Sequence, residues 1–307
     1  MRPLTIHRKG EAILGRDGLA LEALPLEFQR IFPDVSPKYI DNLSLLAAIA
    51  AGRAMDKPLE ENIRKDFAVI MGSAFGSLDS VVDFDAQALQ KGPNTVNPMD
   101  FPNTVANAAG SRIGIWLQLK GPNVMLTNGE TSFIDAIGFA WEGSNSGLFE
   151  HCLVGAVEKL PAFLKSLAAG SPSEAGREGA CFLLASAGPK EDSLFQVVDY
   201  FALQLNPDLS VPKGFKGRFE GLWDGVEWLG CPETTPLDPL FPRGLIRTSP
   251  PSPVRELGLG GLESLIAFIS GTASCGIVGA FSKSERKVSF IKINKKKGAV
   301  ENGSNGN

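Results

Sequence analysis

The sequence predicts a layered α/β fold, and two observations carry this prediction. Short, continuous apolar runs recur between glycine-rich turns, as is typical of strands buried on both faces. Stretches with helical spacing lie between them, and the alternation of strand and helix favours sheets covered by helices. The chain has 307 residues, which is enough for one large domain or two fused ones.

The apolar runs place the expected strands at residues 67–71, 124–126, 152–157, 180–185, 276–281 and 288–293. The helical spacing places the expected helices at residues 39–55, 133–141, 160–169, 194–205 and 261–270. Residues 4–7 and 12–14 are interpreted as two short strands that pair around Lys9 and Gly10. Residues 206–253 are rich in proline and glycine, and we interpret them as an irregular packed loop.

Composition excludes nucleic acid as an expected partner. Hydrophobic residues make up 43% of the chain and charged residues 21%, as in ordinary globular proteins. The net charge is −4, whereas phosphate binding needs a concentrated basic surface. The single basic run, Lys295 to Lys297, precedes a polar tail, and residues 295–307 are expected to be disordered.

No membrane, metal or cofactor is expected either. The first ten residues carry charges where a signal peptide needs an apolar core, and the longest apolar stretch, residues 45–51, is too short to span a bilayer. A cytoplasmic location is therefore expected. No C-x-x-C pair suggests a zinc site or a redox motif among the cysteines, which are Cys152, Cys181, Cys231 and Cys275.

The most informative segment, residues 97–140, ends in a strand that turns sharply into a helix. It begins with a proline-bounded turn and a helix whose small residues allow close backbone approach, namely Ala106, Ala108, Ala109 and Gly110. A side chain at a strand-to-helix elbow lies at a helix N-terminus, where backbone N–H groups and the helix dipole stabilise an anion. Enzymes place nucleophiles there for that reason. The residue at this elbow is Glu130, which cannot form a thioester.

These motifs resemble the N-terminal half of the β-ketoacyl synthase family. The resemblance rests on the Pro98-x-x-Phe101-Pro102 turn, the small-residue helix, the Gly121-Pro122-Asn123 turn and the helix with Ala136 and Ile137. Three other segments agree, DFAVIMGSAFG at 66–76, LVGAVE at 153–158 and EGA at 178–180, so that the likeness covers roughly residues 41–186. When the two are aligned without gaps from Gly121, the family's catalytic cysteine falls on Glu130.

The C-terminal half departs from the family pattern. Condensing members need two histidines there, whereas this chain has only His7 and His151, neither in a matching place. Residues 234–238 resemble the G-T-G-T-x-x-x-D loop without its histidine, and Leu259 stands where the second histidine belongs. The glycine-rich F-G-F-G-G turn is not visible. The resemblance implies a thiolase-like αβαβα fold with a ketosynthase-like N-terminal half at residues 1–190 and a shortened C-terminal half at 191–294.

Glu130 then has three interpretations. It is a structural remnant that fixes the elbow, or the plug of an inactive subunit, as in chain-length factors, or an active base that would need a raised pKa. We favour the first two, because the histidines are missing together with the cysteine. No catalytic residue is therefore expected.

The resemblance implies a chain-length-factor-like subunit that pairs with an active β-ketoacyl synthase in type II polyketide, polyene or fatty-acid-like synthesis. Acyl carrier protein is the second expected partner. The family's dimer interface corresponds to about residues 97–125, where Met99, Phe101 and Thr104 are candidates to reach the partner's acyl tunnel. Two alternatives stay open: a stand-alone decarboxylase or acyltransferase that uses Glu130, and a homodimeric protein that binds acyl chains or carrier protein.

Overall fold

Strands and helices alternate through most of the chain, as the sequence predicts. The computed structural model describes residues 1–16, 18–55, 59–167, 178–212, 223–230, 246–248, 259 and 261–295. The strands are β1 (Leu4–Ile13), β2 (Ala68–Gly72), β3 (Asn123–Leu126), β4 (His151–Glu158), β5 (Gly179–Ala187), β6 (Phe195–Gln204), β7 (Trp228–Gly230), β8 (Ile246–Thr248), β9 (Cys275–Ser282) and β10 (Lys287–Asn294). The α-helices are α1 (Leu24–Ile31), α2 (Asn42–Ala54), α3 (Glu61–Arg64), α4 (Leu78–Lys91), α5 (Ala108–Trp116), α6 (Ser132–Asn145), α7 (Ala162–Leu167) and α9 (Leu262–Ser270). Short 3-10 helices are η1 (Leu21–Ala23), η2 (Pro93–Thr95), η3 (Pro98–Thr104) and η4 (Gly129–Thr131).

The sheet has the same topology in its two halves. The described strands follow the order β3-β2-β4-β5-β1-β6-β10-β9-β7-β8. In the first half β4 lies antiparallel to β5 and parallel to β2, and in the second half β9 lies antiparallel to β10 and parallel to β7. Strands β1 and β6 join the halves through a short antiparallel ladder between residues 4–6 and 195–197. The second half therefore repeats the fold of the first.

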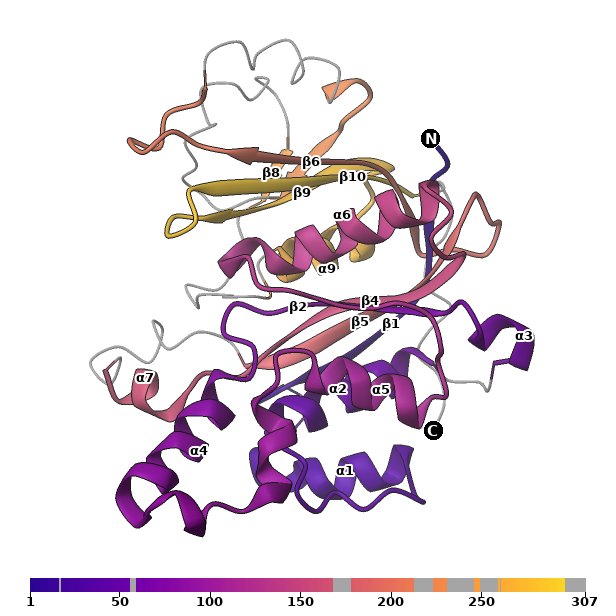
Figure 1. Ribbon diagram of the computed structural model, residues 1–307. Helices are drawn as coiled ribbons and strands as arrows, with labels where there is room; N and C mark the ends of the chain where they lie inside the picture. The colour runs from indigo at the N-terminus through magenta and orange to yellow at the C-terminus, as the bar shows by residue number, and fades with distance from the viewer. Residues whose placement is uncertain are drawn as a thin grey trace.

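The two half-sheets enclose a central helical layer. Figure 1 shows α6 and α9 between the half-sheets, with α1, α2 and α5 on the outer face of the first. One apolar core lies around α6 between the half-sheets, and a second lies around α2 beneath the first half-sheet. Helix α2 begins at the cap Asp41, whose carboxylate accepts a hydrogen bond from Ser44 N, and its residues 43–51 are all buried.

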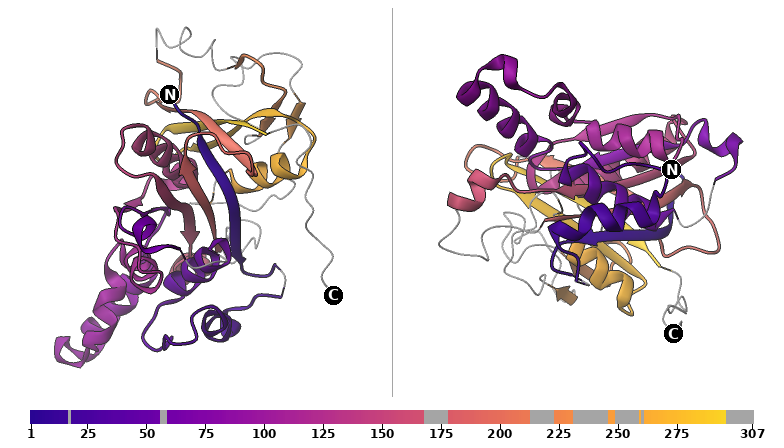
Figure 2. Two further views of the ribbon diagram at one scale, coloured as in Figure 1. Left: turned by 90° about the vertical axis from the view of Figure 1, so that its right-hand side faces the viewer. Right: turned by 90° about the horizontal axis from the view of Figure 1, so that it is seen from below.

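Helix α4 and η3 project away from these layers. Both views in Figure 2 show this arm extending beyond the sheet and its helices. No residue of α4 is buried, and large apolar side chains on the arm are exposed. Contiguous exposed apolar patches mark interaction surfaces in many proteins.

The prediction of a helix at residues 194–205 is wrong, because this segment is strand β6. Its pairing with β10 shifts between Lys292 and Ile293, so that Val198 has no partner opposite. This bulge interrupts the two-residue alternation of buried side chains. The broken alternation, together with the many apolar residues, produced the helical appearance.

The prediction of two short strands around Lys9 and Gly10 is also wrong, since β1 is one continuous strand that pairs with β5 along its length. Gly10 serves helix packing and not a turn: a Cβ there would lie 2.1 Å from Ala50 O of α2. The other predicted strands and helices are confirmed within their described residues, whereas α1, α3 and α4 had no predicted counterpart.

Several sequence-based expectations lie outside the described residues. These are residues 234–238, residues 255–258 and the tail from residue 296 onward. Short strands β7 and β8 lie within the segment that we interpreted as an irregular loop. Within the part of the chain that the structure describes, no helix combines the length and hydropathy needed to cross a bilayer.

Candidate functional site

The strand-to-helix elbow forms where β3 ends and η4 leads into α6. Gly129 adopts a left-handed backbone with φ of 59°, which favours glycine. Its missing side chain also admits the β9–β10 turn, because a Cβ there would lie 2.7 Å from Ser282 Oγ. The elbow therefore requires glycine for two independent reasons, one local and one from the C-terminal half.

Ser132, the first residue of α6, holds the elbow against the end of β2. Its buried hydroxyl lies 2.7 Å from Gly129 O and 3.0 Å from Ser73 O, and it accepts a hydrogen bond of 2.9 Å from Asn128 N. The backbones are also close, since a Cβ on Gly72 would lie 2.3 Å from Ser132 O. The turn that carries Glu130 is thus fixed by hydrogen bonds on both sides of that residue.

Glu130 lies in η4 at the N-terminal end of this helical segment and is half-buried. The partial positive charge of a helix N-terminus stabilises a carboxylate there. The elbow that the sequence predicts is present, and Glu130 is on it. The equivalence of Glu130 to a nucleophile stays a prediction.

Asp135 lies one turn into α6 and is a functional candidate that the sequence reasoning missed. Its side chain is only 3% exposed, yet it accepts five hydrogen bonds. The donors are Asn128 Nδ2 at 2.8 Å, Thr131 Oγ1 at 2.9 Å, Tyr200 OH at 2.9 Å, Lys287 Nζ at 2.6 Å and Ser289 Oγ at 2.5 Å. An aspartate within the apolar stretch at 133–141 was the available signal, because a buried carboxylate needs partners.

The partners of Asp135 come from both halves of the fold. Asn128 and Thr131 belong to the elbow, whereas Tyr200 lies on β6 and Lys287 on β10. Burial and the neighbouring carboxylate of Asp135 raise the pKa of Tyr200 well above its usual range, so that this hydroxyl remains a donor. An ion pair between Asp135 and Lys287 therefore lies at the contact between the elbow and the C-terminal half.

Two segments that carry the sequence resemblance, residues 66–76 and 153–158, meet at Glu158, the last residue of β4. Its fully buried carboxylate accepts hydrogen bonds from Ala74 N at 2.7 Å, Ser73 Oγ at 3.2 Å and Phe75 N at 3.3 Å. The strand at 153–158 therefore anchors the loop after β2. That loop in turn supports Ser132 and the elbow.

The candidates for a partner's tunnel lie on the projecting arm. Met99 and Phe101 are 55% and 57% exposed, and the Phe101 ring lies 5.9 Å from that of Phe84 on α4. Thr104 is half-buried and its hydroxyl donates to Phe101 O at 2.8 Å. The three residues lie together on η3, away from Glu130 in sequence and on the outside of this chain.

Leu259 is fully buried in the core between the half-sheets. Gly261 follows with φ of 89°, and a Cβ there would lie 2.8 Å from Ile134 Cδ1 of α6. The leucine side chain has no group that could donate or accept a proton. The histidines lie elsewhere: His151 begins β4 at the end opposite Glu158, and His7 contacts Ser186 Oγ at 2.7 Å on the facing strand.

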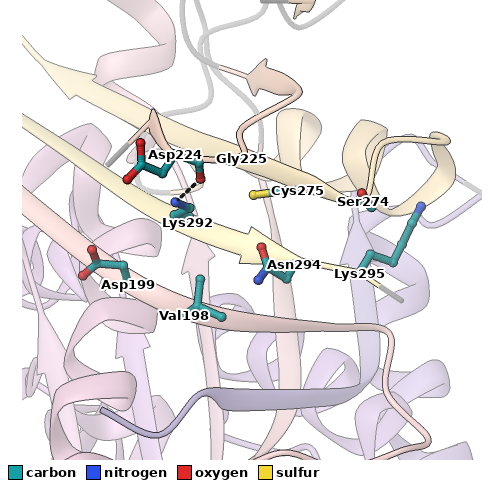
Figure 3. Close-up of a pocket in the computed structure, with 9 residues that line it drawn as sticks. All are labelled: Val198, Asp199, Asp224, Gly225, Ser274, Cys275, Lys292, Asn294 and Lys295. Carbon is teal, nitrogen blue, oxygen red and sulfur yellow. Dashed lines mark hydrogen bonds between the residues drawn. The ribbon is translucent and has the colours of Figure 1, made fainter. Parts of the chain in front are cut away.

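Two pockets lined by described residues lie away from the elbow. The larger, with a volume of about 520 Å³, is open and lies where β10 ends and β9 begins. Figure 3 shows Lys292 beneath the Asp224–Gly225 turn, and its ammonium group donates to Asp224 O at 2.7 Å. Cys275 faces the same pocket, and burial raises the pKa of its thiol. Neither pocket includes Glu130.

No metal site is evident among the residues that the structure describes, where no three His, Cys, Asp or Glu side chains are grouped to hold an ion. Cys152 and Cys181 are fully buried in the sheet, as expected of small apolar side chains.

Comparison with known families gives one match over more than half of the chain. The model of the β-ketoacyl synthase N-terminal domain matches residues 8–174. The 3-oxoacyl-[acyl-carrier-protein] synthase 2 of Vibrio harveyi is 31% identical over 123 residues, or 38% of this chain and 29% of that enzyme. The enzyme of the same description from Vibrio cholerae serotype O1 is 29% identical over 100 residues, or 33% of this chain and 24% of that enzyme. The chain thus aligns with less than a third of the length of these curated relatives.

Solved structures confirm the thiolase-like fold. AntDE:AntF, a type II PKS acyl-carrier protein in complex with its ketosynthase bound to the hexaketide, gives a TM-score of 0.74 at 15% identity, covering 96% of this chain and 99% of that chain. The ishigamide ketosynthase/chain length factor gives 0.70 at 17% identity, with the same coverage of 96% and 99%. At such identities the likeness is one of fold.

Proposed function

The chain belongs to the β-ketoacyl synthase family, and we propose that it is a non-condensing, chain-length-factor-like subunit that pairs with an active ketosynthase. The observation that carries this proposal is the elbow. Its backbone is held by hydrogen bonds of the Ser132 hydroxyl with Asn128 N and Ser73 O, yet it presents the carboxylate of Glu130. A carboxylate cannot take over an acyl chain as the thiolate of a condensing enzyme does.

The buried Leu259 supports the same proposal. Decarboxylation of a malonyl thioester develops negative charge, which condensing enzymes stabilise with histidine. Here Leu259, which the sequence resemblance places at one of these histidines, is aliphatic and lies in the core. The two histidines of the chain lie on β1 and β4, at the other end of the first half-sheet from the loop that supports the elbow.

The arm and the adjacent sheet edge support pairing. Apolar side chains that are 45–86% exposed lie on α4, η3 and α5 and at Val105 between the last two: Leu89, Met99, Phe101, Val105 and Ile115. Helices α4 and α5 each contact η3. Strand β3 packs beside α5 and ends the described sheet, so that one side of its backbone is open to another strand. Exposed apolar side chains and an open strand edge both suit a protein partner.

A ketosynthase and an acyl carrier protein are the proposed partners, in type II polyketide, polyene or fatty-acid-like synthesis. The two structural neighbours are complexes described as a ketosynthase with its carrier protein and as a ketosynthase with a chain length factor. In this arrangement Met99, Phe101 and Thr104 face the partner's acyl tunnel and limit the length of the chain that it builds.

The test is a reconstituted reaction. A ketosynthase that retains its cysteine and both histidines is supplied with acyl carrier protein and a malonyl donor, with and without this chain. We expect product of defined length only when this chain is present, and the same product with Glu130→Gln. A ketosynthase whose rate and product length do not respond to this chain would contradict the proposal.

The same reaction separates the alternatives. A stand-alone decarboxylase or acyltransferase would consume the malonyl group without the ketosynthase and would lose that activity with Glu130→Gln. A homodimeric binding protein would retain carrier protein on a column but leave the ketosynthase reaction unchanged.

A further inference from the structure

Asp135 connects the elbow to the C-terminal half through hydrogen bonds to both. Two of its donors, Asn128 and Thr131, flank Glu130 in sequence. Three others, Tyr200, Lys287 and Ser289, lie on the strands of the second half-sheet. A shift of the elbow and α6 relative to β6 and β10 would therefore separate the buried Asp135 carboxylate from three of its five donors, which is strongly unfavourable.

The β9–β10 hairpin touches the elbow at a second point. Ser282, the last residue of β9, lies against Gly129 immediately before Glu130. Lys287, the first residue of β10, binds Asp135 at 2.6 Å. The residues at the two ends of this short turn thus contact Gly129 in the elbow and Asp135 just after it.

A buried hydrogen-bond network at this place defines the position of the elbow relative to the second half-sheet more strictly than apolar packing would. Apolar residues of similar size often give equal or greater stability than a buried ion pair. Apolar packing, however, tolerates small displacements of the packed elements, whereas five directed hydrogen bonds define one arrangement. This difference points to a role in orientation in addition to stability.

We propose that Asp135 is a positioning residue that fixes the orientation of the elbow carrying Glu130 and couples it to the β9–β10 hairpin. The biological meaning of this inference rests on the proposed function. In that function, the elbow and the hairpin act as one rigid unit in the complex with the ketosynthase. Loss of the coupling would then broaden the range of chain lengths that the partner ketosynthase makes.

Hydrogen–deuterium exchange on the chain alone tests the coupling without a partner. We expect Asp135→Asn to raise amide exchange of the elbow, residues 126–134, by about tenfold or more, because charged hydrogen bonds are lost. Tyr200→Phe removes a single hydroxyl and keeps the ring, and should raise exchange at the elbow by a smaller factor. Exchange in β4 and β5 should stay unchanged in both variants. Glu142→Gln, an exposed change on the same helix, is the matched control.

Two results would overturn the inference: elbow exchange that equals the wild type in Tyr200→Phe and Asp135→Asn, or exchange that rises equally throughout the chain. The second arm measures product lengths of the ketosynthase complex with Tyr200→Phe, where a broader distribution than with Glu142→Gln is expected. If the wild-type chain does not affect the ketosynthase, the proposed function fails, and the exchange data still decide the role of Asp135.

Discussion

The aromatic ring of Tyr200 lies directly against Gly138, where a Cβ on the glycine would approach Tyr200 Cδ2 to 2.3 Å. Gly138 follows Asp135 by three residues on α6, and the hydroxyl of the same tyrosine reaches Asp135 at 2.9 Å. The missing side chain therefore sets how closely the central helix approaches β6. It also determines whether the tyrosine can reach the carboxylate.

Gly138→Ala should destabilise the fold by about 1–3 kcal/mol, because the added methyl group displaces the ring in a packed core. Alanine's better helix propensity, about 1 kcal/mol, offsets only part of this cost. The control is Gly114→Ala on α5, where the nearest atom to a new Cβ is Leu119 O at 3.5 Å. Urea unfolding of both variants checks the prediction. Equal midpoints for the two variants would count against the close approach.

Glu130→Cys should place a thiol at the elbow without creating a condensing enzyme. A thiolate at a helix N-terminus is able to accept an acyl group. Condensation should still be absent, because Leu259 is buried and aliphatic and the described histidines lie on other strands. Mass spectrometry detects the acyl-enzyme, and release of the elongated product measures condensation. Product formed by Glu130→Cys alone would show that the histidines are dispensable.

Met99→Ser combined with Phe101→Ser should weaken binding to the ketosynthase by about tenfold or more, as expected when apolar anchors leave an interface. Leu26→Ser is the control, because Leu26 is 58% exposed on α1, outside the arm. Titration calorimetry with the purified partner gives the two affinities. A similar loss in both variants would place the interface elsewhere.

Stability should fall as pH drops from 7 to 5, in part through His151. Burial lowers the pKa of His151, and Lys190 and His7 lower it further, while Glu150 raises it. Because the folded pKa lies below the unfolded value of about 6.5, the folded state binds fewer protons. The stability that this group contributes is thus present above pH of about 6.5 and is lost as pH falls through that value toward the folded pKa. His151→Gln should flatten the change in unfolding midpoint over this range, and an unchanged slope would contradict it.

Six of the described strands and the elbow could be predicted from sequence because their signals are local. Continuous apolar runs marked both buried half-sheets, and the turn at residues 128–131 marked the elbow. Strand β6 could not be predicted, because the bulge at Val198 removes the alternation that identifies a strand. Helix α4 was missed although its apolar residues are spaced as in an amphipathic helix, and none of its residues is buried.

The site was predicted only in part, because its contacts join distant parts of the chain. Glu130 follows from its position after β3, whereas three of the five partners of Asp135 lie 65 to 154 residues away on β6 and β10. The roles of Met99, Phe101 and Thr104 and the boundary at residue 190 stay predictions.

Native mass spectrometry of this chain co-expressed with a complete ketosynthase tests the central claim most directly. We expect a one-to-one complex of the two chains that survives purification through a tag on either one. This chain recovered without the ketosynthase, as a monomer or as a homodimer, would contradict its role as a pairing subunit.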